Sequence, residues 1–257
     1  QMLKMLEGFD LKSMGHNSPE YLHTLIEAKK LAYADLAGHV ADPDHMLVAP
    51  GRMLDPAYLR ARAALIDPAR AAERPAPGSF STDSETIYLS VADEDGNMVS
   101  FIGSIFEYFG SGVVVPGTGF ALQNRGAGFT LEAGHPNRLA PGKRPFHTII
   151  PAFVTKDGQP WLSFGVMGGA MQPQGHVQVL LNLLEFGMDL QEAVDAPRFR
   201  HYSGTSVAIE NLPVDVADKL RTLGHTLRDP AGVAFGGAQA VMRLPRGWAA
   251  ASDPRKD

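Results

Sequence analysis

The chain has 257 residues, which is enough for one large domain or two small ones with a sizeable hydrophobic core. Its net charge of −5 gives no reason to expect nucleic acid or an anionic membrane as a partner. It has no cysteine, which excludes disulfides, thiolate catalysis and cysteine-bound zinc. No apolar run approaches the roughly 18 residues of a membrane span, and the start lacks the features of a signal peptide. The first residue, Gln1, suggests a fragment or a processed product, and we expect a cytoplasmic rather than a periplasmic protein.

The first third of the chain has helical patterning. Residues 17–20 read Asn-Ser-Pro-Glu, a polar cap followed by proline, and apolar residues then recur at helical spacing as far as Leu36. A second helix is predicted after Asp55-Pro56 and ends before Asp67-Pro68. From 68 to 84 the composition changes to Ala, Pro, Arg, Gly and Ser without periodicity, which predicts an exposed linker.

Strand patterns follow the linker. Residues 84–104 alternate apolar with other side chains on both sides of a turn at 95–97, as in a tight β-hairpin. Two more hairpins are predicted at 147–166 and 238–252, with helices at 175–187, 190–195 and 214–224. Hairpins interleaved with helices predict an α+β fold in which helices cover largely antiparallel sheets.

Most of the common sequence motifs for catalytic and binding sites do not match this chain. The glycines after 109 do not fit the dinucleotide pattern, Gly142-Lys143 lacks the upstream glycine of a phosphate-binding loop, and Gly103-Ser104 is not set in a nucleophile elbow. Scattered histidines such as His176 and His201 are better explained as surface or hydrogen-bonded core residues than as metal ligands. We therefore expect neither a metal nor a nucleotide, and no other cofactor.

Thr86 stands at the start of the first predicted strand, directly after the linker. If the chain were cut after Glu85, Thr86 would become an N-terminus whose α-amine, with a pKa of about 8, could take the proton of its own hydroxyl. Alternatively, Thr86 is simply a β-branched residue suited to the start of a strand.

A second candidate feature is the glycine-rich run from Gly165 to Gly169, which ends a predicted strand and leads into a helix. Consecutive backbone N–H groups at such a junction can face a developing oxyanion. The alternative is that the paired glycines only make a tight turn.

A series of motifs occurs in a recognisable order. TIYLSVADEDGN, FGSGVVVPGTGFALQN, PGKRP, GVMGG, FGM, APRF and ASDPR follow the helical segment PEYLHTLIEAKKLAYADLAGHVADPD. On these motifs the chain resembles the γ-glutamyltranspeptidase family of N-terminal-nucleophile hydrolases over nearly its whole length.

The resemblance implies a zymogen that cuts itself before Thr86 and folds as a four-layer αββα sandwich. Residues 1–85 would then be the helical end of a large subunit with its linker, and residues 86–257 the small subunit. The expected partners are a small-molecule amide substrate and the remaining large-subunit segment, with a homo-oligomer left open.

The resemblance also assigns roles to single residues. Thr86 matches the nucleophile, and Gly168-Gly169 match the oxyanion hole. Ser104 occupies the place of a hydroxyl residue that assists self-cleavage. His147-Thr148 occupy the place of a serine pair that helps to hold the substrate's α-carboxylate.

The chain departs from the family where glutamyl-specific members bind the substrate's α-amino group. Those members have Asn, Gln and Asp, whereas this chain has Phe106, Arg125 and Gly128. An ammonium group needs acceptors around it, and an arginine repels it. Arg125 could instead face a carboxylate or a carbonyl, and an ordinary surface arginine is the alternative.

These features lead to two hypotheses. The first is a γ-glutamyltranspeptidase-like amidohydrolase or acyltransferase that forms an acyl-enzyme on Thr86, with an oxamate-like or cephalosporin-side-chain-like substrate in place of a γ-glutamyl one. The second is a family member that does not mature and acts as a binding or structural protein, since the sequence runs unbroken through Glu85-Thr86.

Overall fold

The computed structural model describes residues 1–73, 85–231 and 234–256. In chain order its elements are α1 (Met2–Leu6), α2 (Leu11–Met14), α3 (Pro19–His39), η1 (Pro43–His45), α4 (Pro50–Met53), α5 (Pro56–Ala63), β1 (Glu85–Ala92), β2 (Met98–Phe106), η2 (Arg125–Gly128), β3 (Ala152–Lys156), β4 (Gln159–Met167), α6 (Met171–Leu184), α7 (Leu190–Asp195), β5 (Phe199–His201), β6 (Ser206–Ile209), α8 (Val214–Thr222), β7 (Thr226–Leu227), β8 (Gly237–Arg243) and β9 (Trp248–Ser252). This mixture confirms the predicted α+β class. Across these residues, no helix combines the length and the apolar character needed to cross a bilayer.

The elements form two compact units, each assembled from separate stretches of the chain. The first unit takes residues 1–81, 126–146 and 199–233, and the second takes 82–125, 147–198 and 234–257. These units are defined by packing. The predicted boundary between residues 85 and 86 concerns a cut in the backbone, and it stays a prediction.

The first unit is built around α3. Ser18 caps this helix by accepting a hydrogen bond from the backbone N–H of Tyr21, and Pro19 begins the first turn. Helices α1, α2 and α8 pack against α3, and so does strand β5 of a small sheet with the order β5-β6-β7. Apolar residues of α3 such as Leu25 and Ile26 are fully buried, so this helix forms the core of the unit.

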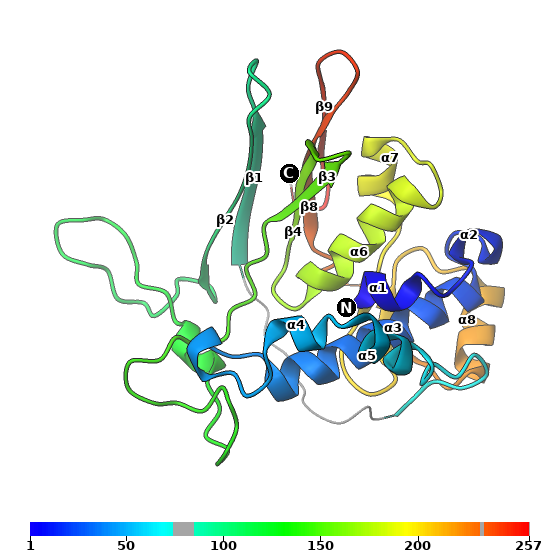
Figure 1. Ribbon diagram of the computed structural model, residues 1–257, viewed down its shortest axis with the longest axis horizontal. Helices are drawn as coiled ribbons and strands as arrows, with labels where there is room; N and C mark the ends of the chain where they lie inside the picture. Colours follow the sequence, from blue (N-terminus) through cyan, green and yellow to red (C-terminus); the bar gives the residue numbers. More distant parts are fainter. Residues whose placement is uncertain (74–84, 232–233, 257) are drawn as a thin grey trace. The chain divides into compact units, whose positions relative to one another are not determined.

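The second unit has three layers (Figure 1). The antiparallel hairpin β1-β2 is one layer, the four-stranded sheet β3-β4-β8-β9 is the next, and α6 and α7 cover the other face of that sheet. Every second residue of β4 faces the helices. These residues, Leu162, Phe164 and Val166, belong to the unit's main hydrophobic core.

The alternate residues of β4 face the hairpin. A Cβ atom built on Gly165 would lie 2.4 Å from the ring of Tyr88, so only glycine lets β1 approach β4 this closely. Beside this contact, Ser163 bonds the Ser90 hydroxyl at 2.7 Å, while Tyr88 bonds Ser100 at 2.7 Å. The close packing and these hydrogen bonds together fix the position of β1 along β4.

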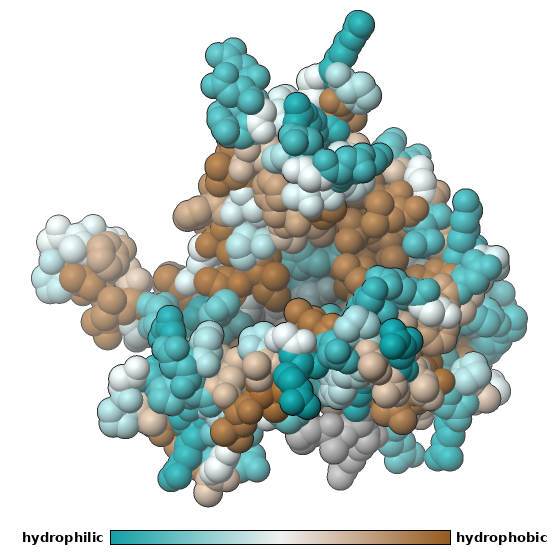
Figure 2. Space-filling model, in the orientation of Figure 1, coloured by the Kyte–Doolittle hydropathy of each residue, from teal (hydrophilic) through white to brown (hydrophobic). Residues whose placement is uncertain are grey.

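The outer face of the hairpin is apolar and exposed. Its side chains are Ile87, Leu89 and Val91 from β1, and Val99 and Phe101 from β2, each at least 42% exposed. Figure 2 shows apolar residues on this hairpin and on the loop after β2, where Phe109 is 83% exposed. Apolar surface of this extent is typical of a face that another layer covers.

The structure corrects several expected boundaries. Helix α6 begins at Met171, ahead of the expected start near residue 175, and the strand expected from residue 147 begins only at Ala152. The first residues of the expected exposed linker are held in place, because the Ala71 N–H donates to the Leu223 carbonyl at 2.6 Å and Ala71 is buried. The rest of that linker, residues 74–84, lies outside the described residues.

Candidate active site

Thr86 lies in a β-bulge. Glu85 pairs with Phe106 but Ile87 pairs with Gly103, so the register shifts by one residue around Thr86. Bulges of this kind re-aim a side chain and are common beside active sites. Thr86 is 9% exposed, on the same face of β1 as Tyr88, and its hydroxyl donates to the Ser104 hydroxyl at 3.4 Å. The structure therefore brings the predicted nucleophile and its predicted helper together.

Ser104 links Thr86 to Phe106. The Ser104 hydroxyl accepts a hydrogen bond from the backbone N–H of Phe106 at 3.0 Å. Phe106 has φ of +79°, in the region that bulky side chains avoid, and its side chain is buried. Backbone strain of this type often marks functional sites, where neighbouring contacts hold it in place.

Arg125 is buried next to Phe106, which overturns the alternative of an ordinary surface arginine. It is 7% exposed, and its guanidinium lies 5.1 Å from the centre of the Phe106 ring. Its Nη1 donates to the Thr148 hydroxyl at 3.3 Å, whereas its buried Nη2 has no hydrogen-bond partner within the described ranges. Burial lowers the pKa of Arg125. Burial, and then the charge of Arg125, lower the pKa of His147.

The glycine turn after β4 has left-handed backbone angles, with φ of +118° at Gly168 and +56° at Gly169. Its internal hydrogen bonds use the carbonyl oxygens, which accept from the N–H groups of Met171 and Gln172. A Cβ atom on Gly168 would lie 3.2 Å from the Cα of Gly236, so the turn is packed closely against the start of β8. The N–H groups of the two glycines take no part in these two hydrogen bonds.

The contacts between β1 and β4 advance in a regular step. Ser90 of β1 bonds Ser163 of β4. Tyr88, two residues earlier in β1, contacts Gly165, which is two residues later in β4. Strands rise about 3.3 Å per residue, so from these contacts β1 continues toward Thr86 while β4 continues toward the glycine turn at its end.

Two further residues support this region: Gln172, which was missed from the sequence, and His176, which was expected only as a surface or hydrogen-bonded core residue. Gln172 is fully buried and accepts a hydrogen bond from the Ile150 N–H at 2.9 Å, which holds the segment that carries Thr148. His176 accepts from the Val166 N–H at 3.3 Å and so ties α6 to the end of β4. The signal that could have found Gln172 is the polar run after Gly169, which enters an otherwise apolar helix.

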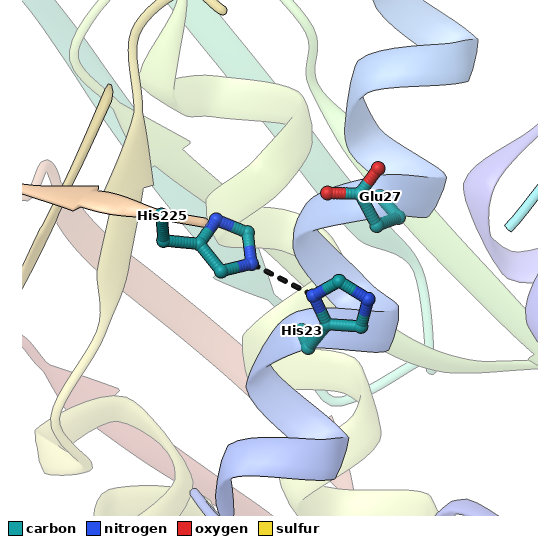
Figure 3. A group of neighbouring side chains, drawn as sticks. All are labelled: His23, Glu27 and His225. Atoms are coloured by element: carbon teal, nitrogen blue, oxygen red, sulfur yellow. Dashed lines mark hydrogen bonds between the residues drawn. The ribbon is translucent and has the colours of Figure 1, made fainter. Parts of the chain in front are cut away.

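One group of residues in the first unit has the composition of a metal site (Figure 3). His23, Glu27 and His225 bring ligand atoms within 4.8 Å of one another. However, His23 bonds His225 at 2.8 Å with one ring nitrogen and the Asp67 carbonyl with the other. Glu27 pairs with Lys30 at 2.6 Å. These partners engage most of the group within the core, whereas the buried Nδ1 of His225 has no hydrogen-bond partner among the described residues.

Buried histidines predict a loss of stability in acid. Burial is the main cause that lowers the pKa of His176 to about 4, of His225 to about 3 and of His201 to about 2. These groups bind protons more weakly in the folded chain than in the unfolded chain. Their contribution to stability is therefore complete above pH of about 6.5 and falls toward their folded pKa values, by about 1.4 kcal/mol per pH unit for each histidine.

We expect the urea midpoint to fall between pH 7.5 and pH 5. The variant His225→Gln is expected to reduce this pH dependence by at most about 1.4 kcal/mol per pH unit, since it removes one of the buried histidines whose pKa is lowered. A His45→Gln variant, at an exposed position, serves as the matched control and keeps the full dependence. A midpoint that stays constant over this range would contradict the prediction.

Comparison with known proteins identifies the family. The model of the family described as gamma-glutamyltranspeptidase matches residues 1–257. The chain belongs to this family, which confirms the resemblance seen in its motifs. A solved cephalosporin acylase from Bacillus halodurans superposes with a TM-score of 0.85 at 43% identity, covering 99% of this chain and 48% of that one.

Two curated relatives show the range of activities around this chain. The glutathione hydrolase-like YwrD proenzyme of Bacillus subtilis (strain 168) is 35% identical over 99% of this chain and 50% of its own length. The oxamate amidohydrolase proenzyme of Klebsiella pneumoniae is 37% identical over 96% of this chain and 48% of its own length. The chain therefore spans about half the length of the relatives it matches.

Proposed function

We propose that the protein is an amidohydrolase or acyltransferase that matures by cutting itself before Thr86. The observation that carries this proposal is the buried Thr86 hydroxyl in a β-bulge, 3.4 Å from Ser104. The family membership and the proenzyme names of the relatives support it.

In maturation, the Thr86 hydroxyl attacks the carbonyl carbon of Glu85. The peptide C–N bond breaks and a C–O ester forms, so the hydroxyl proton ends on the released α-amine. Water then hydrolyses the ester, which leaves a carboxylate on Glu85 and restores the Thr86 hydroxyl. Ser104 accepts the hydrogen bond of the attacking hydroxyl and orients it.

In turnover, the free α-amine of Thr86 takes the hydroxyl proton while the oxygen attacks the substrate's amide carbonyl. The N–H groups of Gly168 and Gly169 hold the oxyanion, a role supported by the left-handed turn that these residues form after β4. The C–N bond breaks, the leaving amine receives the proton, and an acyl ester remains on Thr86. Water or an acceptor amine then attacks this ester and restores the hydroxyl.

The substrate is an acyl amide other than a γ-glutamyl amide. Phe106 and Arg125 stand where glutamyl-specific members offer acceptors for the α-ammonium group, and Arg125 is buried with its positive charge. Relatives named for acylase and oxamate amidohydrolase activities are consistent with such a substrate.

The four-layer sandwich belongs to the same proposal. Hairpin, sheet and helices supply three layers in the second unit. We propose that a helical layer of the remaining large-subunit segment covers the exposed face formed by Ile87, Leu89 and Phe101.

The test is to trap the acyl-enzyme. Protein expressed from the complete coding sequence is mixed with a panel of γ-glutamyl, oxamate and other acyl amides, quenched in acid and analysed by peptide mass mapping. The account expects an acyl adduct on the peptide that begins with Thr86. An adduct on another residue, or turnover without any adduct, would reject Thr86 as the nucleophile, and a chain that neither cuts nor turns over would favour a binding protein.

A further inference from the structure

We propose that His176 is a positioning residue for the glycine turn. Its ring joins the strand that enters the turn to the helix that leaves it, and so fixes the direction of the Gly168 and Gly169 N–H groups. This inference rests on the proposed function, because it concerns the turn that is to hold the oxyanion. It adds a buried side chain that acts through the turn rather than on the substrate.

The first observation is a gap in the sheet just before the turn. The pairing of β3 with β4 ends at Ala152 and Phe164. Two residues further along β4, the backbone N–H of Val166 donates to Nε2 of the buried His176 at 3.3 Å. The ring thus takes the place of the acceptor that a neighbouring strand would supply, and a buried N–H group needs such a partner. His176 therefore holds the chain two residues before Gly168.

The second observation is the other nitrogen of the same ring. Nδ1 of His176 bonds the carbonyl oxygen of Gln172, which lies in the first turn of α6. The backbone N–H of Gln172 in turn donates to the carbonyl oxygen of Gly169 at 3.0 Å. One imidazole therefore connects Val166, before the two glycines, with Gln172, after them.

The third observation is that a single arrangement of protons serves both contacts. The N–H of Val166 needs a lone pair on Nε2, and the carbonyl of Gln172 needs a proton on Nδ1. Burial is the main cause that lowers the pKa of His176 to about 4, so the ring is neutral at neutral pH and can keep this tautomer. The ring of Phe164 packs against the imidazole edge to face, with 5.2 Å between the ring centres, and restricts its rotation.

The test separates the two contacts with two amide variants. His176→Gln can place its amide oxygen where Nε2 accepts from Val166, whereas the shorter side chain of His176→Asn reaches only the position of Nδ1. We expect His176→Gln to keep most of kcat and His176→Asn to lower kcat by about 10–100-fold, because small displacements of catalytic groups have effects of this size. KM is expected to change little, since the turn acts in the transition state.

The protein is expressed from the complete coding sequence and assayed with a p-nitroanilide that the unaltered protein hydrolyses. Intact mass gives the fraction cut before Thr86, and kcat is expressed per cut chain. Val179→Ala is the matched control, because it removes buried side-chain atoms from the same helix and from the main core of the unit. It is expected to lower the urea midpoint and to leave kcat unchanged.

A double variant tests whether His176 acts through the turn. In a Gly168→Ala background the turn has already lost its alignment, so His176→Asn is expected to cause little further loss of kcat. Two losses that simply multiply would mean that His176 acts independently of the turn, and would overturn the inference.

Two other results would overturn the inference while leaving the proposed function standing. One is an unchanged kcat in cut His176→Asn protein, and the other is an equal loss in both amide variants. If His176→Asn does not fold, the ¹⁵N chemical shifts of the His176 ring in the unaltered protein decide the matter. A proton on Nδ1 supports the inference, and a proton on Nε2 rejects it. Failure of the proposed function has a different signature, an uncut chain or turnover without an acyl adduct on Thr86.

Discussion

Replacing Thr86 by alanine is expected to leave an uncut chain without amidase activity. The change removes the hydroxyl that attacks Glu85 in maturation and the substrate in turnover, while the methyl group keeps the side chain's place on the inner face of β1. Loss of a nucleophile lowers kcat by at least about 10⁴-fold in comparable enzymes. Intact mass and an anilide assay on the same sample measure both losses together.

Two variants sharpen this result. Thr86→Ser keeps a hydroxyl and is expected to cut itself and retain activity. Thr155→Ala removes a hydroxyl from an exposed position of β3 and is expected to behave as the unaltered protein. An actively cutting Thr86→Ala variant would eliminate the proposed mechanism.

Replacing Gly168 by alanine is expected to lower kcat by about 10²–10³-fold, the range seen when an oxyanion donor is lost. Its φ of +118° is strained for any residue with a side chain, and the new Cβ would lie 3.2 Å from Gly236 and 3.3 Å from the Cβ of Met171. The strained φ and the crowding together favour a rotation of the peptide groups of the turn, which takes their N–H groups out of line. The readout is kcat measured separately from KM.

Gly187→Ala is the matched control for backbone strain. Gly187 has a positive φ of +65°, but a Cβ atom there would meet no atom within 4 Å. Gly187→Ala therefore carries a left-handed backbone cost of about 1–2 kcal/mol without a steric clash, and only Gly168→Ala is expected to lose kcat. Unchanged kcat in Gly168→Ala would show that this turn does not hold the oxyanion.

Features with local causes were predictable from the sequence. The Ser18-Pro19 start of α3 depends on adjacent residues, and so does the start of α7, where Asp189 and Glu192 form a capping box. The hairpin of β1 and β2 follows from alternation and from the turn at Gly96, whose φ is +88°. These signals lie within a few residues of the element they define.

Features with distant causes were not predictable. Arg125 is buried beside Phe106, whose φ is positive, and bonds Thr148, which lies 23 residues further along the chain. The strands β5, β6 and β7 are too short to show a two-residue alternation in the sequence. The parallel pair β6 and β7 is separated in the chain by α8. The family's motifs indicated roles for Thr86 and Gly168, whereas the contact of Tyr88 with Gly165, which sets how β1 lies on β4, joins residues far apart in the chain.

The central claim is that Thr86 becomes an N-terminus, and intact mass with N-terminal sequencing of protein from the complete coding sequence tests it most directly. The account predicts two fragments, one of which begins with the sequence Thr-Ile-Tyr-Leu that starts at Thr86. A single uncut chain under conditions where the protein is folded, or a break at any other bond, would contradict it.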